Sequence, residues 1–317
     1  MNKYNVDVSI IVPVYNDGNN ISRVIKKLLA EKRINIEIIL VNDGSVDNTL
    51  DVINSFNDKR LLVINQENLG VYAARNAALA KHSGKWLMLL DSDDDFAEDL
   101  IFDRYNEATK HDVDVLISNG RIVDEHDSFA GEIIHRKQIY NHVISGNQWV
   151  EHAVRNNEWP HYLWLQMIRS EYIKKNSLVF NAGYSHQDIL WTAMLGLYNG
   201  RFYISDRPDY FYVNNPHSIT KSNKYYDCRA YSYIEVISKL ILLANGEVNA
   251  GIKKAFLRHA SHECRHFFGL YRKKVSEKNA VKAMFIKKIS FSDLFRGAST
   301  CKQYWLLMRL YRILKAN

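Results

Sequence analysis

The stretch VSIIVPVYNDG (residues 8–18) joins an apolar, β-branched segment to a polar turn, and it sets the pattern of the first 120 residues. The apolar segment predicts a buried strand, and the amphipathic stretch that follows from Ile21 to Ala30 predicts a helix. The alternation recurs, with strands predicted at residues 36–41, 61–64, 86–90 and 113–117 and a helix at 71–81. Short apolar strands alternating with helices predict an α/β fold with a doubly wound, mostly parallel sheet.

Beyond about residue 120 the alternation fades, and from Tyr225 onward the pattern is helical and basic. We therefore expect a ligand-binding half at 1–120, a second half at 121–224 and a helical, basic C-terminal region at 225–317. Residues 251–317 hold 16 Lys and Arg against 3 Asp and Glu, a net charge of +13, whereas residues 1–250 carry −6. The basic character of the chain thus belongs to its C-terminal stretch.

Polar residues follow each of the first four predicted strands, at the edge where parallel α/β sheets bind ligands. The fourth strand is followed by Asp91-Ser92-Asp93-Asp94-Asp95, which places four carboxylates in five residues. Crowded carboxylates raise one another's pKa unless a cation neutralises them. Carboxylate oxygens suit Mg²⁺ or Mn²⁺, so the segment predicts a divalent-metal site. The alternative is a solvated turn that caps the helix predicted near Glu98.

Several other sites are excluded by spacing. An EF-hand loop requires glycine where Phe96 stands and glutamate where Phe102 stands. Neither a phosphate-binding P-loop nor a GxGxxG fingerprint is present, which argues against ATPases and dinucleotide enzymes. The three cysteines are far apart and lack metal-ligand spacing, which fits reduced thiols rather than disulfides.

Four motifs taken together resemble those of family 2 glycosyltransferases. They occur in the order and spacing of that family, as SIIVPVYN (9–16), VNDGS (41–45), NLG with ARN (68–70 and 74–76) and LDSDD (90–94). Each motif alone is weak, but the four in register make the resemblance specific over about the first 120 residues. The resemblance implies a GT-A fold, a nucleotide-diphosphate-sugar donor, Mn²⁺ or Mg²⁺, and inversion at the anomeric carbon.

The resemblance also assigns the nucleotide pocket. Pro13, Tyr15 and Asp43 would line the base and ribose pocket, and Asp43 would accept a hydrogen bond from the N3–H of uracil, which implies a UDP-sugar. Arg75 would face the nucleotide. From the residues alone, Asp43 could instead be a turn aspartate before Gly44, and Arg75 could be a helix-surface arginine.

The metal site follows from the same resemblance. Asp91-Ser92-Asp93 would form the DxD element, in which Asp91 and Asp93 touch the ribose and the metal. Residues 210–220 resemble the strand and loop that close over the diphosphate, which makes His217 a third, weaker metal-ligand candidate. A structural histidine is the alternative for His217.

In similar proteins the catalytic base is the aspartate of a Glu-Asp pair that opens a helix. The matching segment here reads SHQDILW (185–191), so Asp188 would take the proton of the acceptor hydroxyl. The expected glutamate is Gln187, which puts the acceptor contacts in doubt because glutamine carries no charge. The alternative is that Asp188 only occupies a favourable place at a helix N-terminus.

Residues 303–315 predict an amphipathic helix. Its apolar arc would hold Leu306, Leu307, Leu310, Tyr311, Ile313 and Leu314, and its basic arc Lys302, Arg309, Arg312 and Lys315. This pattern favours an interfacial helix on anionic lipid, with a core-packing helix as the alternative. No apolar run approaches the roughly 18 residues that span a bilayer. We expect a cytoplasmic protein that lies on the inner face of a bacterial cytoplasmic membrane.

The resemblance implies an inverting transferase that moves a hexose from a UDP-sugar to a sugar acceptor. A polyprenyl diphosphate-linked sugar would suit the basic tail, in the synthesis of a bacterial surface polysaccharide such as O-antigen. A nucleotidyltransferase is one alternative, but it would need a glycine-rich, lysine-bearing loop where YNDG (15–18) stands. The other is a non-catalytic basic protein that binds membrane or nucleic acid. We expect no nucleic-acid partner, because the acidic N-terminal portion carries the recognisable site.

Overall fold

The computed structural model describes residues 4–315, except 125–126, 182, 184 and 214–222. The chain forms two compact units. The first unit comprises Met1–Gly146, Pro160–Ala182 and Tyr198–Asn215, and the second comprises Asn147–Trp159, Gly183–Leu197 and Pro216–Asn317. The first unit contains the sheet, and the second consists of helices in its described part.

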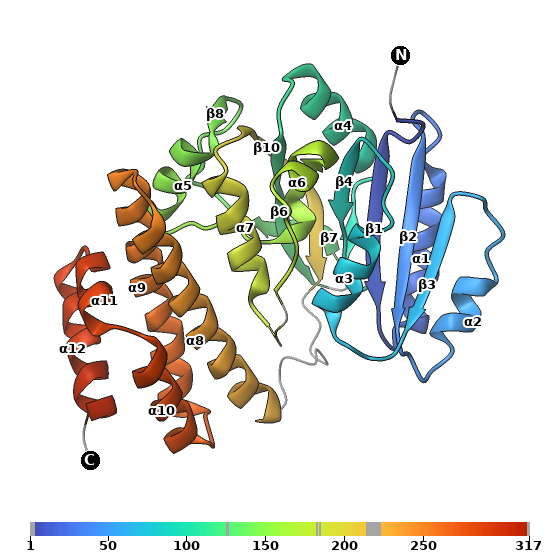
Figure 1. Ribbon diagram of the computed structural model, residues 1–317. Coiled ribbons are helices and arrows are strands. Elements are labelled where there is room, and N and C mark those ends of the chain that lie inside the picture. Colours follow the sequence, from blue (N-terminus) through green and yellow to red (C-terminus); the bar gives the residue numbers. More distant parts are fainter. Residues whose placement is uncertain (1–3, 125–126, 182, 184, 214–222, 316–317) are drawn as a thin grey trace. The chain divides into compact units, whose positions relative to one another are not determined.

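Four parallel strands begin the sheet of the first unit, in the spatial order β3-β2-β1-β4 (Figure 1). They are β1 (Val8–Val14), β2 (Ile36–Asp43), β3 (Leu61–Gln66) and β4 (Trp86–Leu89). Every residue of β1 and β4 is buried, as expected for strands covered on both faces. Parallel strands end at the same edge, so the polar residues after β1, β2 and β4 are brought to one side of the sheet.

The remaining strands make the sheet mixed. β9 (Gln166–Arg169) runs antiparallel between β4 and β6 (Val115–Asp124), and β10 (Arg201–Val213) pairs parallel with β6. The short strands β5 (Asp95–Phe96), β7 (Asp127–Ile133) and β8 (Val143–Ser145) add antiparallel pairs. The α/β class is confirmed, but the parallel pattern holds chiefly for the first four strands. β7 follows β6 too closely for a crossover helix, so it can only return antiparallel.

The helices of the first unit follow the sequence pattern closely. α1 (Gly18–Ala30) buries Ile21, Val24, Ile25 and Leu28, the spacing of one helical face. The predicted helix at 71–81 is α3 (Val71–Leu79), and the helix predicted near Glu98 is α4 (Leu100–Lys110). The shorter elements are α2 (Thr49–Asn54), the 3₁₀ turn η1 (Leu163–Leu165) and α6 (Ser170–Lys175).

A buried ion pair ties α4 to β10 in the core of the first unit. The Arg104 side chain, 1% exposed, donates from Nε and Nη2 to the two carboxylate oxygens of Asp209. Its Nη1 donates to the carbonyl of Trp164 at 2.7 Å, and the Ser118 hydroxyl donates to Asp209 at 3.0 Å. The pair is therefore saturated with hydrogen bonds, as a buried charge requires.

The second unit is built around two helices of 24 residues, α8 (Asn223–Gly246) and α9 (Ala250–Lys273). Asn249 is the N-cap of α9, because its side chain accepts hydrogen bonds from the N–H groups of Gly251 and Ile252. The helical pattern predicted from Tyr225 onward is confirmed. The other helices are α5 (Gly146–Arg155), α7 (Gln187–Leu197), α10 (Lys278–Lys288), α11 (Phe291–Gly297) and α12 (Cys301–Lys315).

Candidate active site

The last residue of β2, Asp43, organises the loop that follows β3. Its buried carboxylate accepts hydrogen bonds from Gln66 Nε2 at 2.7 Å and from the N–H groups of Leu69 and Gly70 at 3.0 and 2.9 Å. A carboxylate has about four lone-pair positions, so one acceptor position remains for a ligand. Gly70 has φ +89°, a conformation that favours glycine at this close approach.

The other two residues predicted for the nucleotide pocket lie on the neighbouring strand. Pro13 is paired in register with Val41 inside the sheet, and Tyr15 follows the end of β1 with 39% of its surface exposed. Pro13, Tyr15 and Asp43 therefore lie at the ends of two adjacent parallel strands. The Tyr15 ring is open to solvent and available to a ligand.

Arg75 lies inside the first unit rather than on the surface of α3. The residue is 7% exposed, and its Nη2 forms an ion pair with Asp91 Oδ1 at 2.8 Å. The guanidinium also lies 5.6 and 5.9 Å from the ring centroids of Tyr72 and Phe180. Its buried Nε has no hydrogen-bond partner in the described part of the chain. The helix-surface alternative is therefore wrong.

The carboxylates of residues 91–95, which we call the acidic tip, have different partners. Asp91 is paired with Arg75, while Asp95 forms ion pairs with Arg23 and Lys27 of α1. The Oδ2 atom of Asp91 accepts no hydrogen bond from the described residues. Three cations thus neutralise Asp91 and Asp95, the first and last residues of the acidic tip.

Asp94 is buried and held by β10. The Tyr210 hydroxyl donates to its Oδ2 at 3.1 Å, and the Val213 N–H donates to its Oδ1 at 3.0 Å. Burial raises the pKa of the Asp94 carboxyl well above its ordinary value, and the charges of Asp91 and Asp93 raise it further. Asp94 is therefore fixed in place by hydrogen bonds and serves to shape the acidic tip.

Asp93 differs from the other members of the acidic tip. Its carboxylate makes no hydrogen bond to another described residue. Its pKa is raised to about 6, first by desolvation among the surrounding atoms and then by the charges of Asp91 and Asp17, although the residue as a whole is exposed. Asp17 Oδ2 is also buried without a partner in the described structure. The Asp93 carboxylate therefore lies close to other negative charges and has no cationic partner in the described structure.

These groups fit a divalent cation bound together with substrate. The described residues contain no group of three or more His, Cys, Asp and Glu side chains that could hold a metal by themselves. Mg²⁺, however, is commonly bound by one or two carboxylates together with substrate phosphates and water. Asp93 and the open oxygen of Asp91 supply such a pair. His217 lies outside the described residues.

An aromatic stack positions the acidic tip. The Tyr210 ring stacks on Trp164 at 4.2 Å between centroids, and Trp164 stacks on Tyr162 at 4.9 Å. The Tyr210 hydroxyl, at the end of this stack, also accepts a hydrogen bond from the Asp91 N–H at 3.3 Å. The sequence shows Tyr210 through its motif, but it carries no signal for Trp164, which reaches the site only through the fold.

Ser92 is a buried residue between the two predicted metal ligands. The sequence shows Asp17 only as a polar residue after the first strand and does not indicate its place beside Asp93. The cations that pair with Asp95 were not predicted either. Arg23 and Lys27 lie four residues apart on α1, so their spacing was the available signal.

Asp188, the predicted base, lies in the first turn of α7 in the second unit and is half-buried. In that unit the ring of His186 lies 4.4 Å from Tyr233. Burial raises the pKa of the Tyr233 hydroxyl, Arg229 opposes the increase, and Glu263 and Asp188 add to it. Asp188 thus belongs to a cluster of aromatic and ionisable side chains at the start of α7.

Gln187, which stands in place of the expected glutamate, is buried at the start of α7. A Cβ atom at Gly183 would lie 2.6 Å from Gln187 Nε2, so the absence of a side chain there makes room for the amide. His186 adopts φ +61° and its Nδ1 lies 2.7 Å from Ser185 Oγ. The N-terminus of α7 is therefore packed around the uncharged side chain of Gln187.

The model of glycosyl transferase family 2 matches residues 9–175. An uncharacterized glycosyltransferase of Escherichia coli K12, YibD, is 28% identical over 188 residues, covering 58% of this chain and 55% of that protein. The glycosyltransferase GlyG of Streptococcus pneumoniae is 37% identical over 123 residues, covering 38% and 41%. The chain thus spans about half the length of these curated relatives.

Solved structures resemble nearly the whole chain. Residues 1–349 of TarS from S. aureus, in complex with UDP-GlcNAc, superpose with a TM-score of 0.68 at 19% identity, covering 97% of this chain and 92% of that one. The mannosyltransferase PcManGT of Pyrobaculum calidifontis, in complex with GDP-Man and Mn²⁺, gives 0.55 at 17% identity, covering 98% and 86%. At these identities the likeness concerns the fold, and the expected GT-A fold is confirmed.

Proposed function

The chain belongs to glycosyl transferase family 2, and from this premise we propose that it transfers a hexose from a UDP-sugar to a sugar acceptor with inversion at the anomeric carbon. The observation that supports the proposal most is the state of Asp93. This carboxylate has no partner of its own and lies next to Asp91, which is already oriented by Arg75. Such a pair is suited to a metal-bound diphosphate, which brings both a cation and further oxygen ligands.

The donor would be held by residues at the ends of β1 and β2. The remaining acceptor position of Asp43 suits the single N3–H donor of uracil, with Pro13 and Tyr15 against the base and ribose. Arg75 would donate to the nucleotide through guanidinium N–H groups that do not bind Asp91. TarS, which shares the fold, was solved with UDP-GlcNAc, and this supports a UDP-linked donor.

The divalent cation would be Mn²⁺ or Mg²⁺, held by Asp93 and Asp91 with Ser92 between them. When bound, it neutralises the charge that develops on the departing diphosphate. The chain's own residues fix the geometry, since Arg75 holds one oxygen of Asp91 and Tyr210 holds the backbone of the same residue. PcManGT was solved with Mn²⁺, which supports Mn²⁺ as the cation to test first. His217 remains a weaker candidate ligand.

Asp188 would act as the general base. Its carboxylate takes the proton from the acceptor hydroxyl, and the oxygen forms a bond to the anomeric carbon as the bond between that carbon and UDP breaks. The electron pair leaves with UDP, and one displacement inverts the centre. The position of Asp188 in the first turn of α7 favours its negative charge.

α12 supports a membrane-bound acceptor. Its buried stripe is Leu307, Leu310 and Leu314 alone, so Tyr311 and Ile313 are exposed, contrary to the predicted arc. The exposed apolar residues of α12 are Tyr304, Trp305, Met308, Tyr311 and Ile313. Tyr304 and Tyr311 also contact Phe295 and Phe291 of α11, so Trp305 is the most exposed aromatic side chain among the basic residues of α12. Aromatic and basic side chains on one exposed helix suit an anionic lipid surface.

We therefore propose a sugar acceptor linked to polyprenyl diphosphate, used on the inner face of a bacterial cytoplasmic membrane in surface polysaccharide synthesis, for example O-antigen. None of the described helices is both long and apolar enough to cross a membrane. The nucleotidyltransferase alternative does not fit the family. A non-catalytic binding protein would differ by lacking sugar transfer.

The direct experiment is a panel of UDP-sugars assayed for transfer to diphosphate-lipid acceptors, with Mn²⁺ and with EDTA. We expect transfer with one UDP-sugar, its loss in EDTA, and its loss in Asp93→Ala. Transfer that survives both EDTA and Asp93→Ala would remove the metal from the account. UDP binding without transfer to any acceptor of the panel would favour the non-catalytic alternative.

A further inference from the structure

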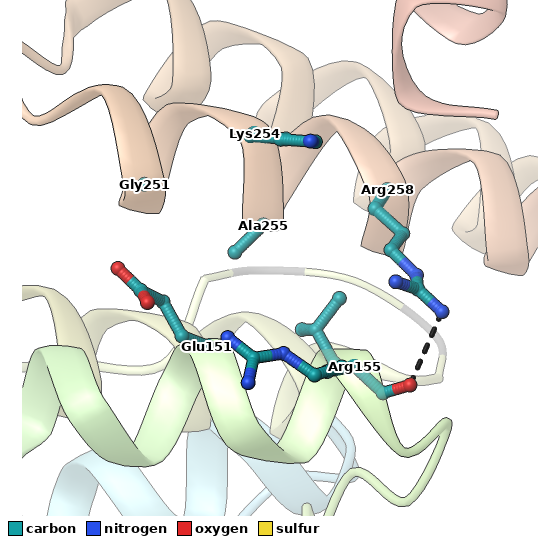
Figure 2. Close-up of a pocket in the computed structure, with 7 residues that line it drawn as sticks. Glu151, Arg155, Gly251, Lys254, Ala255 and Arg258 are labelled. Carbon is teal, nitrogen blue, oxygen red and sulfur yellow. Dashed lines mark hydrogen bonds between the residues drawn. The ribbon is translucent and has the colours of Figure 1, made fainter. Parts of the chain in front are cut away.

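A pocket of about 180 Å³ lies between α5 and the first half of α9, within the second unit (Figure 2). α5 contributes Glu151, Val154 and Arg155, and α9 contributes Gly251, Lys254, Ala255 and Arg258. On each helix these positions are three or four residues apart, so each set forms one face. Two helix faces rich in charge therefore border a space several times the volume of a water molecule, which is about 30 Å³ in the liquid.

The charges around this pocket do not neutralise one another. The pocket is lined by three cations, Arg155, Lys254 and Arg258, and by one carboxylate, Glu151, and none of the three cations forms an ion pair with a described residue. Arg258 Nη2 donates to the carbonyl of Arg155 at 3.1 Å, while its Nε is buried and has no partner in the described structure. The lining thus carries a net charge of +2.

Glu151 is set apart from the cation at the far end. A Cβ atom at Gly251 would lie 2.2 Å from Glu151 Oε1, so the missing side chain lets the carboxylate lie against α9. Figure 2 shows Glu151 at the Gly251 end and Arg258 at the opposite end. The N–H groups of Gly251 and Ile252 already donate to Asn249. A ligand would therefore be held by the basic side chains and not by the start of the helix.

We propose that this pocket binds a phosphate group. Guanidinium groups offer planar, paired donors that match the oxygens of phosphate, and Lys254 adds a mobile positive charge. A phosphate dianion would balance the net charge of +2, whereas a carboxylate would balance half of it. The pocket lies within the second unit, and the proposal does not depend on the sugar-transfer reaction.

The test compares three proteins by calorimetric titration with inorganic phosphate at constant ionic strength. The pocket variant is Arg155→Gln with Lys254→Gln, which spares Arg258 because that side chain also supports the end of α5. The matched control is Lys253→Gln with Lys273→Gln, which removes two charges from α9 outside the pocket. Unchanged circular dichroism and Tm in both variants show that each is folded.

We expect wild type and control to bind phosphate equally, and the pocket variant to bind at least tenfold more weakly. The diphosphate site of the first unit is the same in all three proteins, so only the difference between them reports on the pocket. Equal binding by the pocket variant and wild type would overturn the proposal, as would an equal loss in the control.

A second measurement identifies the source of the phosphate. Vesicles of phosphatidylglycerol and of phosphatidylcholine are sedimented with the same three proteins. If a lipid headgroup fills the pocket, the pocket variant alone binds phosphatidylglycerol more weakly than wild type does. If a soluble or acceptor-borne phosphate fills it, vesicle binding persists while inorganic phosphate binding is lost. Both results support the site.

Discussion

The hydroxyl of Tyr210 donates a hydrogen bond of 3.1 Å to the buried carboxylate of Asp94. The two residues are 116 positions apart in sequence, so this bond ties the end of β10 to the acidic tip that follows β4. The same hydroxyl accepts from the Asp91 N–H, and the Tyr210 ring is fixed by stacking on Trp164. The position of the predicted metal ligands therefore depends on a strand that lies far along the chain.

Tyr210→Phe should loosen the acidic tip while keeping the aromatic stack. It leaves Asp94 and the Asp91 N–H each short of a partner, and an unsatisfied buried polar group costs about 1–3 kcal/mol. We expect a lower Tm and weaker Mn²⁺ binding. The control is Tyr212→Phe, since Tyr212 is 40% exposed and belongs to the same strand. Equal effects of the two substitutions would show that the Tyr210 hydroxyl does not hold the tip.

The Arg104–Asp209 pair makes a prediction about stability alone. Arg104→Met leaves Asp209 buried and uncompensated, and breaking a buried pair in this way costs about 3–5 kcal/mol. The urea concentration at the midpoint of unfolding should fall accordingly. Replacing both residues, as Arg104→Met with Asp209→Leu, should recover part of the loss because no lone charge remains. A double variant that is no more stable than the single one would contradict this reasoning.

Asp93 should lower the stability of the metal-free protein at neutral pH. Its folded pKa, about 6, lies above its ordinary value of 3.8, so between these values the folded state binds more protons than the unfolded state. Stability therefore falls as the pH rises through this interval and stays reduced at pH 7. Asp93→Asn should raise the Tm of the metal-free protein at pH 7, and the difference should shrink toward pH 4.

The control for Asp93 lies two residues away. Asp95 is paired with Arg23 and Lys27, so Asp95→Asn should lower the Tm at pH 7. Calorimetric scans at pH 4 and 7 in EDTA check both variants. If Asp93→Asn lowered the Tm as Asp95→Asn does, the Asp93 carboxylate would have a partner in the protein and would not be the open metal ligand.

The exposed face of α12 should contribute to membrane binding. Trp305 is 64% exposed, and Arg309 lies over its ring at 5.4 Å. Trp305→Ser, or Glu in place of Arg309 and Arg312, should weaken binding to anionic vesicles, by about 1 kcal/mol for each basic residue. Leu242→Ser, at a residue 70% exposed on α8, is the control. Equal vesicle binding by all these proteins would show that α12 does not contribute to membrane binding and only packs against the rest of the second unit.

The sequence predicts the part of the fold that depends on local pattern. The strands β1 to β4 and the helix α1 lie where their apolar periods place them, and the acidic tip follows β4 as expected. The strand β6 begins within two residues of its predicted position, but β5, β8 and β9 were not predicted, because they have two, three and four residues and leave no periodic signal. Short strands acquire their pairing from the rest of the sheet rather than from their own sequence.

The candidate site was predicted only in part, for a similar reason. Motifs indicate Asp91 and Asp93, but the partners that distinguish them come from distant segments. Arg23 reaches Asp95 across 72 positions, and Tyr210 reaches Asp94 across 116. The burial of Arg75 was equally hidden, because α3 is rich in alanine and its sequence does not mark a buried face.

The central claim is tested most directly by the rate of transfer from a saturating UDP-sugar by Asp188→Asn. Asparagine keeps the size of the side chain but cannot take the acceptor proton, and removing a general base costs about 10²–10⁴-fold in rate. We predict UDP binding equal to wild type and transfer at least about a hundredfold slower. A rate near that of the wild type would remove Asp188 from the mechanism and contradict the account.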